Sequence, residues 1–245
     1  AILIGAIIVF IYANFVVDKI LLGPAHDNFI TYSWFCKMGH FFGLGDTLCF
    51  GAVKAQFIAT AMTEQFVTTF TVAFVGGFII TFPYVFWEFW RFVKPALSQK
   101  EIKRTRGVIF WVSFLFFLGV AFGYYILTPF MVNFYFSYKL SPMITIMPTF
   151  SDYVENLVYT TVGIGVLFQM PLLVSLLAKI GFLKAKFLKK YRRHAFVILI
   201  TAAAIITPST DPFSLMIVTI PLYALYEESI ALASRINKRQ EEEAK

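Results

Sequence analysis

One carboxylate stands alone in a strongly basic stretch of the sequence. Glu101 lies in the segment 92–106, F-V-K-P-A-L-S-Q-K-E-I-K-R-T-R, where every other charged residue is Lys or Arg. A carboxylate can accept two parallel hydrogen bonds from one guanidinium, and in this loop a cationic ligand would depend on that single acid. The alternative is a surface ion pair with Arg104, which would contribute less than about 1 kcal/mol. The chemistry of the loop alone leaves both interpretations open.

A polar amide lies in the middle of an apolar run. Gln169 stands near the centre of the charge-free run 156–178, two residues before Pro171. At the middle of a membrane such an amide faces protein or water rather than lipid. Gln169 therefore either bonds a neighbouring helix, for example at the carbonyl that Pro171 leaves free, or meets a polar side chain of a partner helix. Because the amide is neutral, it cannot relay a proton by itself.

The cysteines and the other acids give no sign of a catalytic or metal site. Cys36 and Cys49 enclose His40 and Asp46, but their spacing matches no standard zinc pattern. Outside the cytoplasm the two cysteines could instead form a disulfide. The G-L-G-D sequence at 43–46 is similar to the Gly-x-Gly-Asp of intramembrane aspartyl proteases, but it lies outside the apolar runs and has no partner aspartate in one. Metalloprotease, serine hydrolase and Walker-type sequences are also missing, so we expect no enzyme, no metal and no cofactor.

The residues around these side chains form long apolar blocks. Of the 245 residues, 59% are hydrophobic and 14% are charged, whereas about a quarter of a soluble domain is charged. A helix needs about 20 apolar residues to cross a bilayer. We therefore predict an all-α integral membrane protein, with residues 1–245 as a single polytopic membrane domain. Its six spans cover about 1–17, 65–90, 107–137, 153–179, 194–208 and 213–232, with an outer loop at 18–64.

The ends of the apolar runs predict further features. Because the apolar sequence starts at Ala1, we expect the chain to begin inside a span, with its natural start missing. A secretory signal peptide would need a basic region and a small-residue cleavage site. We expect a short interfacial helix at 52–62, and we expect Asp152 and Glu155 to cap the fourth span. The fifth and sixth spans are short, which implies local thinning of the bilayer or a polar cavity beside them.

Prolines lie in or at the ends of four apolar runs. Each one removes a backbone hydrogen bond and bends a helix. We therefore predict kinked helices that form a concave bundle. The four prolines are Pro83, Pro129, Pro171 and Pro221.

The positive charges gather on one side of the predicted spans. The loops after the second, fourth and sixth spans hold 17 of the 21 Lys and Arg residues. The positive-inside rule places these loops, and with six spans both termini, in the cytoplasm. We expect Glu227, at the inner end of the sixth span, to pair with one of the basic loops. Because topology accounts for the net charge of +7, no nucleic acid is expected as a partner.

Several segments carry recognisable signatures, among them P-A-L-S-Q-K-E, R-R-H and T-P-S-T-D-P. The segments are Phe89–Arg104, Gly119–Tyr124, Ser151–Val154, Phe168–Val174, Tyr191–Val197, Ile206–Ser214 and Ile220–Glu227. In this order they resemble the TatC family, whose members are the core receptor subunits of the twin-arginine protein translocase. The resemblance covers the second to sixth spans and is weakest over the outer loop 18–64.

The resemblance implies a six-helix, glove-shaped protein of the bacterial cytoplasmic membrane with both termini in the cytoplasm. It implies a receptor that binds the twin-arginine signal peptides of folded precursors and works with TatA- and TatB-like single-span subunits, driven by the protonmotive force. Self-association and contact with membrane lipid are also expected. Two alternatives stay open. A secondary transporter of a small solute would need ion sites at the midplane, often in two related halves, and a structural membrane scaffold would need neither.

The resemblance also implies roles for individual residues. The signal-peptide site, with the acid in contact with the twin arginines, is expected at Glu101, Phe92, Pro95, Leu97, Lys94 and Arg104. Partner helices are expected to dock at Gln169, Thr207 and Phe213. Many relatives have Glu at the position of Gln169, so a polar rather than a charged contact is expected there. The family's amino-terminal cytoplasmic segment, which supplies a second acidic contact, does not precede Ala1 in this sequence, and the outer loop is longer than usual.

Overall fold

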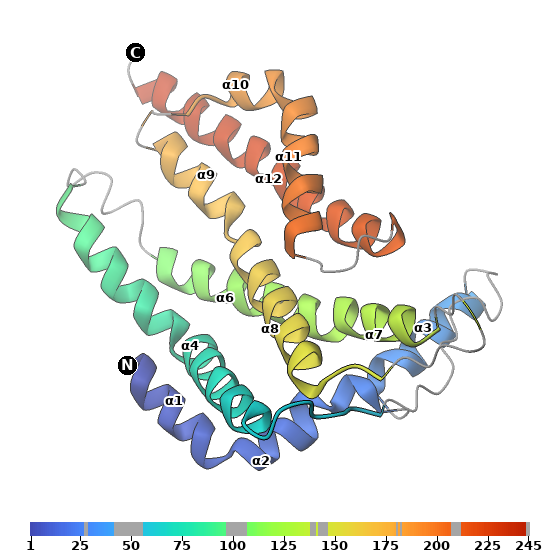
Figure 1. Cartoon of the computed structure of the whole chain (residues 1–245). Helices are drawn as coiled ribbons and strands as arrows, with labels where there is room; N and C mark the ends of the chain where they lie inside the picture. The colour runs from blue at the N-terminus through green and yellow to red at the C-terminus, as the bar shows by residue number, and fades with distance from the viewer. Residues whose placement is uncertain are drawn as a thin grey trace. The chain divides into compact units, whose positions relative to one another are not determined.

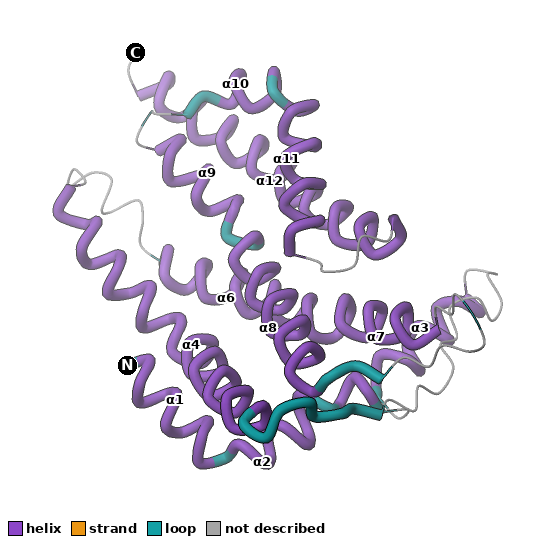
Figure 2. Tube along the Cα trace, in the orientation of Figure 1, coloured by secondary structure: helices purple, strands orange, loops and turns teal. Residues whose placement is uncertain are grey.

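The computed structural model describes most of the chain as helix. The described residues are 1–26, 29–41, 56–96, 107–137, 141, 147–179, 181, 183–206 and 212–243. Helices make up most of these ranges, with loops and turns between them (Figure 2). One isolated β-bridge links Ile58 with Thr149. The predicted all-α fold is confirmed.

The helices follow the apolar runs of the sequence (Figure 1). The first part of the chain holds α1 (Ile2–Ile11), α2 (Ala13–Phe15), the π-helix η1 (Val16–Leu21), the 3-10 helix η2 (Gly23–Ala25) and α3 (Ile30–Phe41). The middle holds α4 (Glu64–Val93), the 3-10 helix η4 (Lys94–Ala96), α6 (Val108–Phe122), the π-helix η5 (Gly123–Leu127) and α7 (Thr128–Ser137). The last part holds α8 (Phe150–Leu167), α9 (Met170–Lys179), α10 (Ala185–Lys190), α11 (Arg192–Ile206) and α12 (Pro212–Glu243).

Four helical stretches of the described chain are long and apolar enough to cross a membrane. They are Glu64–Val93, Val108–Phe136, Phe150–Lys179 and Leu215–Lys238. The pair Ile2–Ile11 and Ala13–Leu21, bent by 77°, makes a fifth if it counts as one span. The helix α11 has 15 residues, fewer than the roughly 20 that a perpendicular span needs. The multi-pass membrane class is therefore confirmed, whereas the number of six spans and the concave shape stay predictions.

The four prolines have two different effects on the helices. Pro171 is the second residue of α9, directly after the break from α8, and Pro129 is the second residue of α7, directly after the π-helix η5. Pro83 and Pro221 lie inside α4 and α12, which continue through them. The first pair of prolines therefore lies beside a local irregularity of the helix, and the second pair lies in regular helix.

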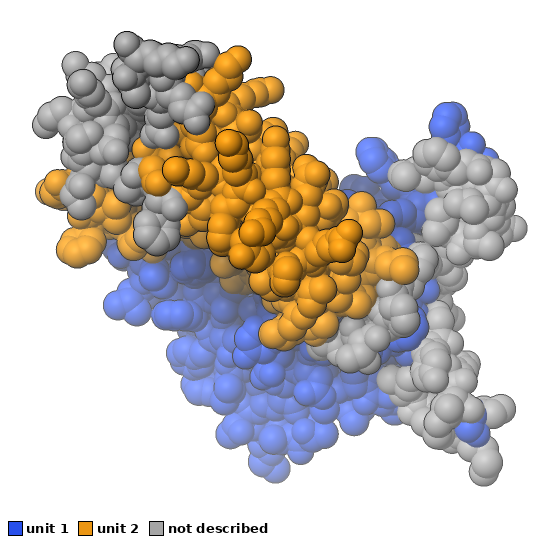
Figure 3. Space-filling model, turned by 90° about the horizontal axis from the view of Figure 1, so that it is seen from above, with its two compact units in different colours: residues 1–81, 121–161 blue, residues 82–120, 162–245 orange. Residues whose placement is uncertain are grey.

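The chain divides into two compact units, coloured separately in Figure 3. Unit 1 consists of residues 1–81 and 121–161, and unit 2 consists of residues 82–120 and 162–245. The borders fall inside α4, at the end of α6 and inside α8.

In unit 1, glycines bring α1 and α4 into backbone contact. A Cβ atom added to Gly77 would lie 2.4 Å from the backbone nitrogen of Ala6, and one added to Gly5 would lie 2.9 Å from the Gly77 carbonyl oxygen. Small residues allow this close approach between membrane helices, where dispersion contacts rather than exclusion of water hold the pair together. The buried side chains of Val9 and Val72 continue the same packing.

Three tyrosine hydroxyls secure the end of the first helical region in unit 1. Tyr124 donates to the carbonyl of Ile20 at 2.6 Å, Tyr153 donates to Leu21 at 2.7 Å and Tyr32 donates to Pro24 at 2.6 Å. The last carbonyls of a helix have no partner within that helix and must find one elsewhere. Donors from three distant elements supply these partners in η1 and η2.

The outer loop of unit 1 differs from its prediction in two places. The helix α3 was not predicted, and its Cys36 is disulfide-bonded, while Cys49 lies outside the described residues. The interfacial helix expected at 52–62 is not found in the described residues 56–62. Ile58 instead bridges Thr149, with the Ile58 amide donating to the Pro148 carbonyl at 3.2 Å. Backbone pairing with a distant segment satisfies these groups in place of a helix.

The residues that cap the start of α8 are not the predicted pair Asp152 and Glu155. The amide of Asp152 donates to the Thr149 hydroxyl at 3.1 Å, so Thr149 is the capping residue. The amide of Ser151 donates to the carboxylate of Glu64 at 3.0 Å, and the same carboxylate accepts the Thr60 amide at 2.7 Å. The prediction was wrong because Asp152 lies inside the first turn, where its own amide needs an acceptor.

In unit 2, an aromatic stack joins the second part of α4 to α6. The rings of Phe82 and Phe116 lie parallel with their centres 3.5 Å apart, and Phe116 is fully buried. Gly119 of α6 faces Gly165 of α8 so closely that an added Cβ would lie 2.9 Å from the Gly165 Cα. The helices α9, α10 and α11 pack on α12. These contacts fix the elements that carry the predicted site residues.

Candidate functional site

Most side chains in the last turns of α4 are exposed or half-buried, and only two of them are buried. Phe82 and Trp90, eight residues apart, are buried. Tyr84, Glu88 and Phe92 follow one another at intervals of four and are all exposed. Residues four apart lie on the same side of a helix, so these three side chains form one line that ends at the carboxyl end of α4. Phe92 is 83% exposed; among the aromatic residues that the structure describes, only Phe41 is more exposed.

Two of the predicted signal-peptide residues follow Phe92 directly. Lys94 and Pro95 are exposed and belong to η4, the single 3-10 turn that ends the helix. Leu97, Glu101 and Arg104 lie outside the described residues. The structure therefore places Phe92, Lys94 and Pro95 together at the end of α4.

Glu88 carries a carboxylate that the sequence interpretation did not single out. Its Oε1 accepts a hydrogen bond from the Tyr84 hydroxyl at 3.0 Å. Within the described chain it forms no ion pair, although Arg91 stands three residues further along the helix. Its position in the sequence could have indicated it, because Glu88 is the first charged residue after the charge-free run 65–87.

Gln169 lies in the break between α8 and α9. Its backbone amide donates to the Val166 carbonyl at 3.0 Å, three residues back, so the Gly165 carbonyl four residues back is left for another donor. The side-chain Nε2 reaches that carbonyl at 3.4 Å. The Oε1 atom is buried and has no hydrogen-bond partner among the described residues. The amide is thus bonded within its own helix on one side and unsatisfied on the other.

The other two predicted docking residues are only partly described. Thr207 lies outside the described residues, and Phe213 lies in the first turn of α12 without a described side chain.

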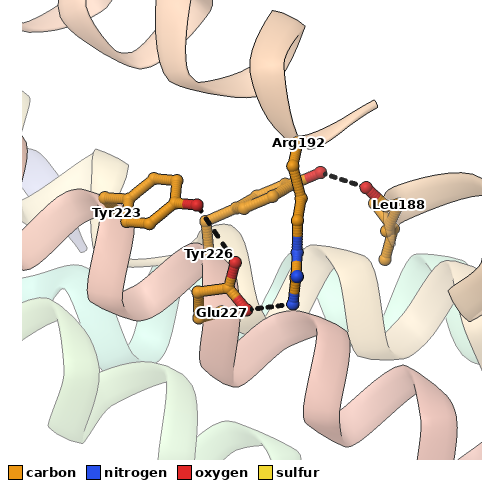
Figure 4. A network of polar contacts seen from close by, with 5 residues as sticks. All are labelled: Leu188, Arg192, Tyr223, Tyr226 and Glu227. Atoms are coloured by element: carbon orange, nitrogen blue, oxygen red, sulfur yellow. Dashed lines mark hydrogen bonds and ion pairs between the residues drawn. The ribbon is translucent and has the colours of Figure 1, made fainter. Parts of the chain in front are cut away.

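An ion pair joins α11 to α12 at the basic end of unit 2. The guanidinium Nη2 of Arg192 lies 2.6 Å from Oε2 of Glu227, and Tyr223 donates its hydroxyl to Oε1 of the same carboxylate at 3.2 Å (Figure 4). One turn away, Tyr226 donates to the Leu188 carbonyl at 2.9 Å, which ties α10 to α12 (Figure 4). The predicted pairing of Glu227 with a basic loop is confirmed. The pair is partly exposed, so its role is to orient α10 and α11 rather than to supply much stability.

No metal centre is found in the part of the chain that the structure describes. There, no three side chains of His, Cys, Asp or Glu are grouped so that they could hold an ion.

Comparison with known proteins gives one consistent family. The family model described as Sec-independent protein translocase protein (TatC) matches residues 1–221. The Sec-independent protein translocase protein TatC of Blattabacterium sp. subsp. Periplaneta americana is 40% identical over 241 residues, which cover 98% of this chain and 90% of the relative. The protein of the same name from Deinococcus radiodurans is 33% identical over 180 residues, covering 74% of this chain and 66% of the relative.

Two crystal structures have a similar fold. A structure titled as the twin arginine translocase receptor TatC matches with a TM-score of 0.72 and 26% identity, over 97% of this chain and 93% of the other. A second structure of that receptor, in DDM, matches with a TM-score of 0.74 and 27% identity, over 95% of this chain and 92% of the other.

Proposed function

This chain belongs to the TatC family of Sec-independent protein translocase proteins, and we propose that the end of α4 is where it receives twin-arginine signal peptides. Family membership makes the chain a receptor component of the twin-arginine translocase, a multi-pass membrane protein that works with other Tat subunits, and not an enzyme. This membership also decides against the small-solute transporter.

The observation that carries the proposed site is the exposed surface at the end of α4. Phe92 projects from the last turn, and exposed Lys94 and Pro95 follow it. A signal peptide joins a cationic front to an apolar run, so its receptor needs an acid beside an apolar surface at the edge of the membrane. Phe92 offers the apolar surface. Glu101, nine residues further along the chain, offers the carboxylate that a guanidinium prefers.

The orientation and the partners are part of the same proposal. The excess of Lys and Arg after the second, fourth and sixth predicted spans supports a cytoplasmic position for this surface and for both termini. We place the protein in the bacterial cytoplasmic membrane, with TatA- and TatB-like single-span subunits as partners and the protonmotive force as the energy source. The buried Oε1 of Gln169, which has no partner among the described residues, supports docking of a polar side chain from such a subunit. Thr207 and Phe213 are proposed to contribute to that docking surface.

Export of a reporter protein tests the receptor role. In cells that lack their own TatC subunit, the full-length protein is expected to restore export of a reporter with a twin-arginine signal peptide. Glu101→Ala is expected to lower export, most clearly when one arginine of the signal is replaced by lysine. Glu228→Ala removes an exposed acid from α12 and serves as the matched control. Unchanged export in Glu101→Ala with both signals would show that the acid is not part of the site.

A further inference from the structure

Glu88 places a charge close to the apolar part of the membrane. The helix α4 has 30 residues, about 45 Å at a rise of roughly 1.5 Å per residue. Glu88 lies about 14 Å from its midpoint by the same rise, whereas half the hydrocarbon thickness is about 15 Å. Glu88 therefore lies at the border of the hydrocarbon layer, where a carboxylate can meet water or a cationic ligand.

Among the described residues, the partner of this carboxylate is a neutral group. The Tyr84 hydroxyl satisfies one lone pair of Oε1 and does not neutralise the negative charge. Among the described residues no Lys or Arg side chain pairs with Glu88, although Arg91 is only three residues away. The hydrogen bond from Tyr84 also restrains the carboxylate, because a donor one turn away limits its rotamers. The Glu88 carboxylate is thus restrained by Tyr84 and still exposed to a ligand.

Glu88 shares its face of α4 with Phe92. The two residues are four apart, both are exposed, and the buried Trp90 lies on the opposite side of the helix. Glu88 lies one turn further from the end of the helix than Phe92, and therefore deeper in the membrane. A ligand that contacts Phe92 and continues toward the membrane passes Glu88.

We propose that Glu88 is a second carboxylate for the twin-arginine pair and binds the arginine nearer to the apolar run of the signal peptide. This inference rests on the proposed function and adds a described residue to the site. The depth of Glu88 selects that arginine, because the apolar run that follows it continues into the membrane. A planar guanidinium can bond both oxygens of a carboxylate, whereas a lysine ammonium acts as a point charge. Glu88 therefore contributes to the preference for arginine at that position.

Peptide binding to the full-length protein in lipid nanodiscs tests this role. A fluorescent twin-arginine signal peptide is titrated against the wild type, Glu88→Gln, Glu88→Asp and the control Glu228→Gln. Glu88→Gln is expected to bind about tenfold more weakly, which corresponds to loss of one charge-assisted hydrogen bond. Glu88→Asp keeps the charge and is expected to recover part of the affinity, while Glu228→Gln binds as the wild type does.

A second peptide separates a contact with the arginine from a general effect of charge. In this peptide the arginine next to the apolar run is replaced by lysine. The wild type is expected to lose affinity with it, whereas Glu88→Gln is expected to lose little more, because the interaction is already gone. Equal losses for the two proteins, or wild-type affinity of Glu88→Gln for the original peptide, would overturn the role of Glu88. A third peptide has lysine in place of both arginines. If the wild type binds all three peptides with equal affinity, the proposed function itself is contradicted.

Discussion

Gln169 is held by a weak bond on one side of its amide and has no bond on the other. Its Nε2 lies 3.4 Å from the Gly165 carbonyl, at the long limit of a hydrogen bond, and its buried Oε1 has no described partner. A buried acceptor without a donor costs about 1–3 kcal/mol. The amide therefore does little for the stability of the isolated chain, and its position fits a residue that a second polypeptide satisfies.

Gln169→Leu tests this interpretation. We expect the thermal unfolding midpoint of the detergent-solubilised protein to stay the same or to rise, because removal of the unsatisfied oxygen offsets loss of the long 3.4 Å bond to the Gly165 carbonyl. Co-purification with the single-span partner subunits is expected to fall. Gln65→Leu changes an exposed glutamine in the first turn of α4 and is expected to leave the association intact. A lower midpoint with unchanged association would assign Gln169 a purely structural role.

Tyr153 shows the opposite case, a buried hydroxyl that the fold needs. It donates to the Leu21 carbonyl at 2.7 Å, and both residues are buried. Tyr153→Phe leaves that carbonyl without a donor, so we expect a loss of about 1–3 kcal/mol in the free energy of unfolding. Tyr84→Phe, which removes an exposed hydroxyl from α4, is the matched control and is expected to change this free energy by less than about 0.5 kcal/mol. Chemical denaturation in detergent measures both, and equal effects would contradict the account of the Tyr153 bond.

At the scale of elements, the contact between α1 and α4 depends on backbone approach at Gly77. An added Cβ there would meet the backbone of Ala6 at 2.4 Å, and backbone cannot move aside without moving the helix. Gly77→Ala is therefore expected to destabilise the protein by about 1–3 kcal/mol. At Gly76 the nearest atoms belong to the side chain of Val9, at 3.1 Å.

Gly76→Ala is the matched control for this prediction because the Val9 side chain can shift. The two variants differ only in which of two neighbouring glycines gains a methyl group. Unfolding midpoints of the purified proteins compare them directly. A larger loss for Gly76→Ala than for Gly77→Ala would mean that α1 does not pack on α4 through the Gly77 backbone.

The sequence anticipated the long helices because one physical rule marks them. Charge is unfavourable in hydrocarbon, so the charge-free runs 65–87 and 107–138 coincide closely with α4 and with the stretch from α6 to α7. The bend between α1 and α2 at Tyr12 was not predictable in this way, because no proline or glycine lies beside it in the sequence. The helix α3 was not predicted because contacts with residues distant in the sequence stabilise it, such as the ring contact between Phe35 and Phe130.

The site was anticipated only in part, for a related reason. Lipid and protein interior favour the same apolar side chains, so the sequence of a membrane helix does not tell which face is covered. The exposure of Phe92 and the line from Tyr84 through Glu88 became visible only with Phe82 stacked on Phe116. The pairing of Glu227 was predictable because acids near a basic loop have few other partners in reach.

At the scale of the whole molecule, the charges and the apolar helices serve one task. In the proposed orientation the basic loops lie in the cytoplasm, and the proposed acids lie on the same side. Glu88 and Glu101 lie on either side of Phe92 in the sequence. In the proposed site a peptide with two arginines before an apolar run meets one acid on each side of the aromatic ring, with Glu88 nearer to the membrane.

The central claim is that the carboxyl end of α4 contacts the twin-arginine signal peptide, and site-specific crosslinking tests it most directly. A photoreactive amino acid replaces either Phe92 or Phe66, an exposed phenylalanine at the opposite end of α4. With a twin-arginine precursor we predict a crosslink from position 92 and none from position 66. The crosslink should disappear when both arginines are replaced by lysine, and it should weaken in Glu101→Ala. A crosslink of equal strength from both positions, or one that does not depend on the arginines, would contradict the account.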